Sequence, residues 1–218
     1  MSNQTLTDTG DLALANPELV ELEVSGLTRS SFLLRGALAA GAVYGVGAVT
    51  PFVSQALAAG SSGDVEILNF ALTLEYLESD FYNVKGKEVH LSGTARSYAK
   101  LFGEQEAEHV KALTSTIKSL GGKPAAKPTF AFPASSQSSF MALASVLENT
   151  GVSAYNGAAP SLKSKEVLAA AGSIVQIEAR HAAAINLLIG KSPTPTQGFD
   201  VPLMKAQVLT KIEPLIKK

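Results

Sequence analysis

Ile177-Glu178-Ala179-Arg180-His181 is the segment that most strongly indicates the fold of this chain. It lies in an apolar, alanine-rich stretch that predicts an α-helix. Glu178 and His181 are three residues apart, so their side chains lie on one face of that helix, one turn apart. A carboxylate and an imidazole in this arrangement can bind the same metal ion, or one side of a metal pair. The segment therefore predicts a metal site inside a helical domain.

The same spacing occurs once more, in Glu106-Ala107-Glu108-His109. A lone glutamate precedes each pair by almost the same number of residues: Glu75 precedes the first pair and Glu148 the second. Such matched spacings indicate a two-helix unit that is used twice. Two such units would bring four carboxylates and two imidazoles together in a bundle of four helices.

Each lone glutamate is followed two helical turns later by a tyrosine, Tyr82 after Glu75 and Tyr155 after Glu148. We expect both tyrosines to be core residues whose hydroxyls bond to the ligands, because a buried phenol needs a hydrogen-bond partner. A radical role is the alternative interpretation of these two residues.

Other acidic residues near the motifs allow more than one interpretation. Glu78 lies one turn after the first lone glutamate; it is either a solvated residue on the flank of the helix or a further ligand. The second unit has Gly151 at the matching position. Glu104 and Glu108 point away from the motif face, and we expect them in solvent, paired with lysines one turn away.

Composition excludes several classes of function. The chain has 218 residues, a net charge of -1 and no cysteine. Without a basic surplus there is no indication of nucleic-acid binding. Without cysteine there is no disulfide, iron–sulfur cluster, thiolate zinc site or cysteine nucleophile.

The N-terminal residues 1–59 predict an export signal. Residues 1–27 are polar and acidic, and we expect them to be disordered. Thr28-Arg29-Ser30-Ser31-Phe32-Leu33 then precedes an uncharged run that ends in Ala56-Leu57-Ala58-Ala59, an order typical of a signal peptide. It resembles a twin-arginine signal, with Ser30 in place of the second arginine. We predict an exported protein (periplasmic, cell-envelope or extracellular), or a membrane-anchored one if the run stays uncleaved, since it is long enough to span a bilayer.

Residues 60–190 predict four helices, at about 65–84, 94–120, 138–159 and 164–189. We expect Gly86 and the polar segment up to Gly93 to break the first helix, and Leu168 and Leu188 to share the inner face of the last. The proline-rich connection at 123–136 can reach about 50 Å, enough to run along a helix of about 40 Å. Residues 191–218 predict a loop and a short helix on the outside of the bundle.

The chain resembles the ferritin-like superfamily, and it is most similar to the desiccation-related ferritin-like domain proteins of bacteria and plants. The resemblance covers residues 64–190 and rests on Leu74-Glu75-Tyr76-Leu77-Glu78, Glu106-x-x-His109, Leu147-Glu148-Asn149 and Glu178-Ala179-Arg180-His181-Ala182. It implies an all-α ferritin-like four-helix bundle with a long crossover between the second and third helices. It also implies two divalent metal ions, Fe or Mn, held by Glu75, Glu106, His109, Glu148, Glu178 and His181. By the same resemblance, Glu106 and Glu178 would bridge the ions.

The alternative to a metal site is that the Glu/His pairs only stabilise the helix surface. Their position in line with the apolar face argues against this, because four buried carboxylates would repel and lose hydration without cations. Ligand type allows Mn, Fe, Co or Zn.

Three functions fit such a site. The first is an oxidoreductase acting on O₂ or peroxide, and the second is a storage protein, which would need a homo-oligomer. The third is a non-enzymatic stress protein of the cell envelope with structural metal. No catalytic residue and no organic cofactor are predicted.

Overall fold

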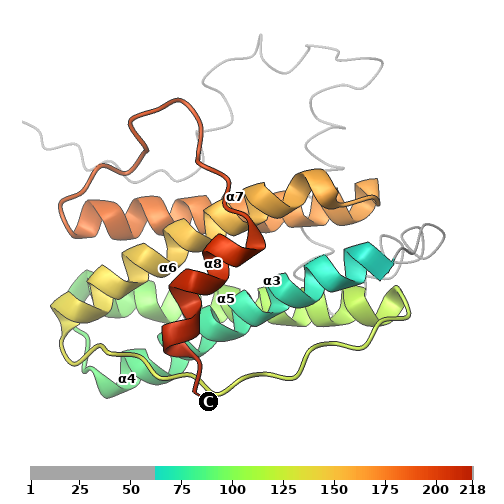
Figure 1. The fold of residues 1–218 in the computed structure, drawn as a ribbon. Helices are drawn as coiled ribbons and strands as arrows, with labels where there is room; N and C mark the ends of the chain where they lie inside the picture. The colour runs from blue at the N-terminus through green and yellow to red at the C-terminus, as the bar shows by residue number, and fades with distance from the viewer. Residues whose placement is uncertain (1–61, 218) are drawn as a thin grey trace, which may run out of the picture. The chain divides into compact units, whose positions relative to one another are not determined.

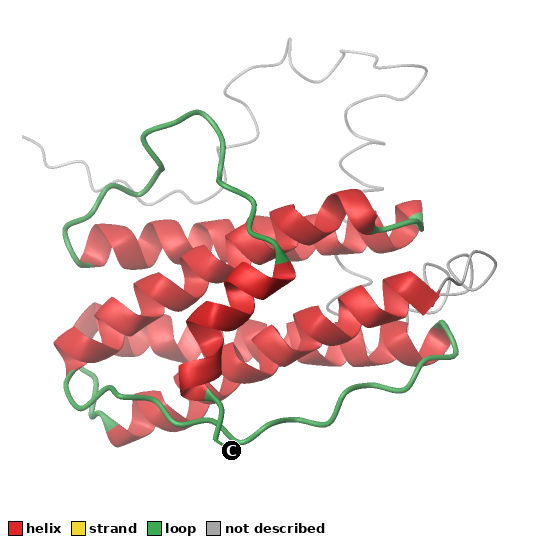
Figure 2. Ribbon diagram, viewed as in Figure 1, coloured by secondary structure: helices red, strands yellow, loops and turns green. Residues whose placement is uncertain are grey.

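The computed structural model describes residues 62–217, so the export signal predicted at 1–59 lies outside the described residues. Within them the chain is helical and contains no β-strand, only an isolated antiparallel bridge between Phe130 and Ile216. Long helices form a bundle, and a shorter one crosses it (Figures 1 and 2). None of the helices in this part of the chain combines the length and the apolar character that crossing a membrane requires. The predicted all-α class is confirmed.

The first helix is longer than expected. It comprises α3 (Ser62–Asp80), a π-helical turn η4 (Phe81–Lys85) and α4 (Gly86–Glu88). The first helix does break in the polar segment before Gly93, as expected, but Gly86 itself is not the breaking residue, because it has right-handed helical angles, φ -59° and ψ -30°. A helical glycine costs about 1 kcal/mol, less than the burial of Phe81 and Tyr82 in η4 contributes. The chain turns only at His90, which has φ 56°.

The other three long helices lie close to their predicted bounds: α5 (Gly93–Ser119), α6 (Gln137–Ala158) and α7 (Lys165–Leu188). The 3₁₀ turn η5 (Ala159–Ser161) follows α6. Side-chain caps begin two of these helices: the hydroxyl of Ser136 accepts from the N–H of Ser139, and that of Ser164 from the N–H of Val167. Gly121, with φ 75°, follows the end of α5, as expected for a C-terminal glycine.

The connection between α5 and α6 runs along the bundle from one end to the other (Figure 1). This confirms the predicted long crossover. Because of it, α6 starts at the end of the bundle where α5 also starts. Helix α3 packs mainly on α5, and α6 packs mainly on α7, so each predicted two-helix unit forms one pair in the bundle.

The C-terminal helix α8 (Lys205–Ile212) and the 3₁₀ turn η6 (Glu213–Leu215) cover the bundle beside α6. Val208, Ile212 and Leu215 are buried in the main apolar core. The following residues pair with the crossover: the N–H of Ala131 donates to the carbonyl of Leu215 (2.8 Å) and the N–H of Lys217 to that of Thr129 (2.9 Å). The C-terminal segment therefore holds the crossover in place.

Two apolar clusters fill the bundle, one containing Phe81 and Phe140 and the other containing Leu72 and Ile117. Along α5 and α7 the Glu/His pairs lie between residues of one cluster and residues of the other. Two apolar residues of α7 expected on its inner face, Leu168 and Leu188, are instead 40% and 39% exposed. That expectation is wrong, since the buried face of α7 is narrower than helical spacing suggested.

Candidate metal centre

The structure brings all six predicted residues together in two groups of four. The first, called here the His109 group, consists of Glu75, Glu106, His109 and Glu178. The second, the His181 group, consists of Glu106, Glu148, Glu178 and His181. In each group one ligand atom per residue lies within 4.8 Å of the others. Every long helix contributes, and Glu106 and Glu178 belong to both groups.

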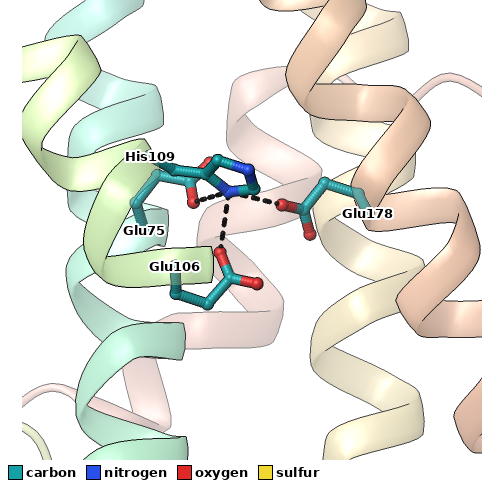
Figure 3. A group of neighbouring side chains, drawn as sticks. All are labelled: Glu75, Glu106, His109 and Glu178. Carbon is teal, nitrogen blue, oxygen red and sulfur yellow. Dashed lines mark hydrogen bonds and ion pairs between the residues drawn. The ribbon is translucent and has the colours of Figure 1, made fainter. Parts of the chain in front are cut away.

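Glu106 lies between the two imidazoles. Its Oε2 is 3.0 Å from Nδ1 of His109, and its Oε1 is 2.9 Å from Nδ1 of His181. Glu178 approaches from the opposite pair of helices, with Oε1 3.2 Å from Nδ1 of His109. Figure 3 shows the carboxylates of Glu75, Glu106 and Glu178 converging on this one nitrogen. Glu106 thus offers one oxygen to each half of the site, as a bridging ligand would.

The lone glutamates are held by tyrosines from the opposite unit. The hydroxyl of Tyr155 donates to Oε1 of Glu75, and the hydroxyl of Tyr82 donates to Oε1 of Glu148. Oε2 of Glu75 is 3.1 Å from the imidazole nitrogen of the His109 group, and Oε2 of Glu148 is 3.4 Å from that of the His181 group. The expected hydrogen bonds from the tyrosines are confirmed, and they leave each lone glutamate one oxygen facing the centre.

Burial makes this cluster costly without a cation. The side chains of the four shared and lone glutamates are 0% exposed. Within the described chain, Oε1 of Glu106, Oε2 of Glu148, both oxygens of Glu178 and Nδ1 of His181 are buried without a hydrogen-bond partner. Unpaired buried charges cost several kcal/mol each. Carboxylate oxygens and imidazole nitrogens that converge without hydrogen bonds fit a divalent metal ion.

Protons take the place of cations in the metal-free site. Burial would raise the pKa of Glu106, but the imidazoles of His109 and His181 beside its two oxygens lower it to about 2. Burial would lower the pKa of both imidazoles, yet the carboxylates raise that of His181 to about 9 and that of His109 well above its usual range. Burial raises the pKa of Glu75 to about 7 and that of Glu178 well above its usual range. Bound metal ions would displace these protons.

Gln105 is a site residue that the sequence reasoning missed. Its Oε1 lies 2.7 Å from Nε2 of His181. With Nε2–H donating to this amide oxygen, Nδ1 of His181 presents its lone pair to the carboxylates. The ring of Phe102 stacks on the same imidazole, with centroids 3.9 Å apart. The available signal was the position of Gln105 next to Glu106, but an amide beside a ligand carries no pattern of its own.

The remaining acidic residues divide into two kinds. Glu104 lies 3.9 Å from Lys100, and Glu108 lies 2.6 Å from Lys111, all on the exposed surface of α5. Both expectations for these surface residues are confirmed. Glu78, by contrast, is only 3% exposed, so its interpretation as a solvated flank residue is wrong.

Comparison with known proteins agrees with this geometry. The family model of the ferritin-like domain matches residues 63–191. No curated protein shows significant similarity to the chain. The crystal structure of a conserved hypothetical protein from Mycobacterium tuberculosis is similar, with a TM-score of 0.55 and 17% identity over 62% of this chain and 96% of that chain. At this identity the likeness shows a common fold alone, whereas the family model spans more than half of the sequence, and the chain therefore belongs to the ferritin-like domain family.

Proposed function

We propose that the chain binds two divalent metal ions, iron or manganese, one in the His109 group and one in the His181 group. The observation that carries this proposal is that both groups share Glu106 and Glu178, while each has its own histidine and lone glutamate. Four carboxylates balance the charge of two divalent ions, and two neutral imidazoles complete the set. The ligand types suit Fe(II) and Mn(II).

We propose further that the loaded centre is redox-active toward O₂ or peroxide. A pair of such ions supplies one electron from each ion to a small oxidant. Tyr82 and Tyr155 orient the lone glutamates, and Gln105 sets the tautomer of His181. The side chain of His109 is 12% exposed, which supports access by small molecules from that side.

A structural or storage role is the second candidate. The complete burial of the four glutamates favours it, because an ion held there would be shielded from exchange and would join all four helices. In this case the protein would be a non-enzymatic, desiccation-related protein of the cell envelope. Its export rests on the signal predicted at residues 1–59.

Metal analysis tests the proposal. The full chain would be loaded with Fe(II) or Mn(II) without oxygen, beside Glu106→Gln/Glu178→Gln and the surface control Glu104→Gln/Glu108→Gln. We expect about two ions per chain in the wild type and the control, and none in the site variant. A folded wild type that retains no metal would contradict the proposal.

Turnover separates the two candidates. If the loaded wild type consumes O₂ or H₂O₂ and its optical spectrum changes, the redox role is supported. If it does neither, while metal raises its melting temperature, the structural role is supported.

A further inference from the structure

Glu78 is a buried carboxyl group that the six-residue site does not use. It lies on α3 one turn after Glu75 and is 3% exposed. No hydrogen bond or ion pair joins Glu78 to another residue of the described chain. A buried carboxylate without a partner costs several kcal/mol. In its charged form Glu78 would therefore need a partner that the polypeptide itself does not supply.

Gly151 makes room for this carboxyl group. It occupies on α6 the position that Glu78 occupies on α3, one turn after the lone glutamate. A Cβ atom at Gly151 would lie 3.2 Å from Oε1 of Glu78 and 3.2 Å from Oε2 of Glu178. The carboxylates of Glu78 and Glu178 thus meet in the space that the missing side chain leaves open.

The position of Glu178 indicates which half of the centre Glu78 serves. Oε1 of Glu178 faces His109 at 3.2 Å. Its other oxygen, Oε2, is the one beside Glu78. Glu78 therefore lies on the side of Glu178 that faces away from His109, which is the side of the His181 group.

We propose that Glu78 is a seventh ligand of the metal centre and serves the ion of the His181 group. This inference rests on the proposed function, since it requires that the centre binds metal. Glu78 belongs to neither group of four, so it approaches from their edge, across the space opened by Gly151. The first two-helix unit thus contributes one more carboxylate than the second.

Charge gives this extra ligand a chemical consequence. Two divalent ions cancel four carboxylates, and a trivalent ion in place of one of them balances a fifth charged carboxylate. A charged Glu78 therefore favours a divalent–trivalent pair over two divalent ions. If Glu78 were instead a neutral carboxylic acid, glutamine would replace it without loss of metal affinity.

Glutamine at position 78 separates these two states because it keeps the shape and removes the charge. Chelator competition would measure the affinity of the full chain for Co(II) and Mn(II) in the wild type, in Glu78→Gln and in the surface control Glu104→Gln. We expect Glu78→Gln to lower the affinity for the ion of the His181 group by about 10-fold or more. It should also change the visible absorption of bound Co(II). Glu104→Gln should match the wild type.

The outcomes distinguish this inference from the proposed function. If Glu78→Gln binds both ions with wild-type affinity and spectrum, Glu78 is not a ligand, while the metal centre itself stands. If the wild type binds no ion, both proposals fail.

Gly151→Ala provides a second test if Glu78→Gln does not fold. It would force Glu78 and Glu178 to shift by a few tenths of an ångström without changing any charge. Weakened binding of one ion supports the inference if Glu78→Asp, which leaves Glu178 in place, weakens the binding of the same ion; unchanged binding in either variant overturns it.

Discussion

The His109 group and the His181 group are built from two copies of one two-helix unit, yet their histidines lie in different surroundings. The side chain of His181 is 2% exposed; Gln105 binds its Nε2, and Phe102 stacks on its ring. The side chain of His109 is 12% exposed, and its Nε2 has no hydrogen-bond partner within the described chain. A repeated motif thus produces one enclosed and one more open half of a single centre.

The residues one helical turn after the two lone glutamates also differ. Glu75 is followed by Glu78, whereas Glu148 is followed by Gly151, which leaves space at the edge of the His181 group. We expect the His181 group to hold its ion more tightly, because its imidazole is positioned before metal arrives and one more carboxylate lies nearby. The His109 group is the side at which an ion or a small oxidant has access.

The largest expected effect comes from a residue that both groups share. Glu106→Gln should lower the affinity for both ions by more than about 100-fold. Loss of a direct ligand should cost more than loss of a residue that supports a ligand, which lowers affinity about 10- to 100-fold. Metal content by mass spectrometry after dialysis would measure this, with Glu108→Gln on the same helix as control. Loss of only one ion would show that Glu106 does not bridge the groups.

The pH dependence should separate the two groups. Since the metal-free imidazoles have raised pKa values, each ion must displace a proton, and affinity should increase about tenfold per pH unit for each proton released. The pKa of His181 is about 9, so its imidazole should no longer contribute to the increase in affinity for its ion above that pH. The pKa of His109 is raised further, so the affinity of the other ion should continue to rise.

Calorimetry in buffers of different ionisation enthalpy would count the released protons. Equal proton release for both ions at every pH between about 7 and 10 would contradict this difference between the groups.

Replacing Gln105 should make the enclosed half resemble the open one. Gln105→Leu removes the acceptor that holds Nε2–H of His181, so Nδ1 is no longer held toward the carboxylates. We expect about a 10-fold loss of affinity for the ion of the His181 group and no change for the ion of the His109 group. Chelator competition would measure both affinities. Ser115→Ala, on the exposed face of the same helix, is a suitable control. Equal weakening of both ions would show that Gln105 supports the whole centre.

The smallest effect should come from the crossed tyrosines. Tyr82→Phe removes the hydrogen bond to Glu148, and Tyr155→Phe removes the one to Glu75. Each loss should lower the free energy of unfolding by about 1 kcal/mol, measured by urea denaturation of the metal-free chain. If Tyr82→Phe weakened the ion of the His109 group instead of the other ion, the crossed arrangement would be wrong.

The sequence alone was sufficient to predict the four long helices, the crossover and the clustering of the six Glu and His residues. Spacing of three residues in Glu106–His109 and Glu178–His181 places ligands on one helix face whatever the surroundings. Repetition of the unit then predicts that these faces meet, because a two-metal centre takes its carboxylates and imidazoles from all four helices of a bundle.

Tertiary packing decided which side chains are buried and which meet between helices, and the helical periodicity of the sequence does not encode this. Gly86 stays helical because Phe81 and Tyr82 are buried in the preceding π-helical turn. Glu78 is buried because α6 carries a glycine opposite it, and Gln105 reaches His181 because α5 lies beside α7. Helical spacing determines which residues share a face, but which atoms meet across helices depends on how the helices pack and on the volume of each facing side chain.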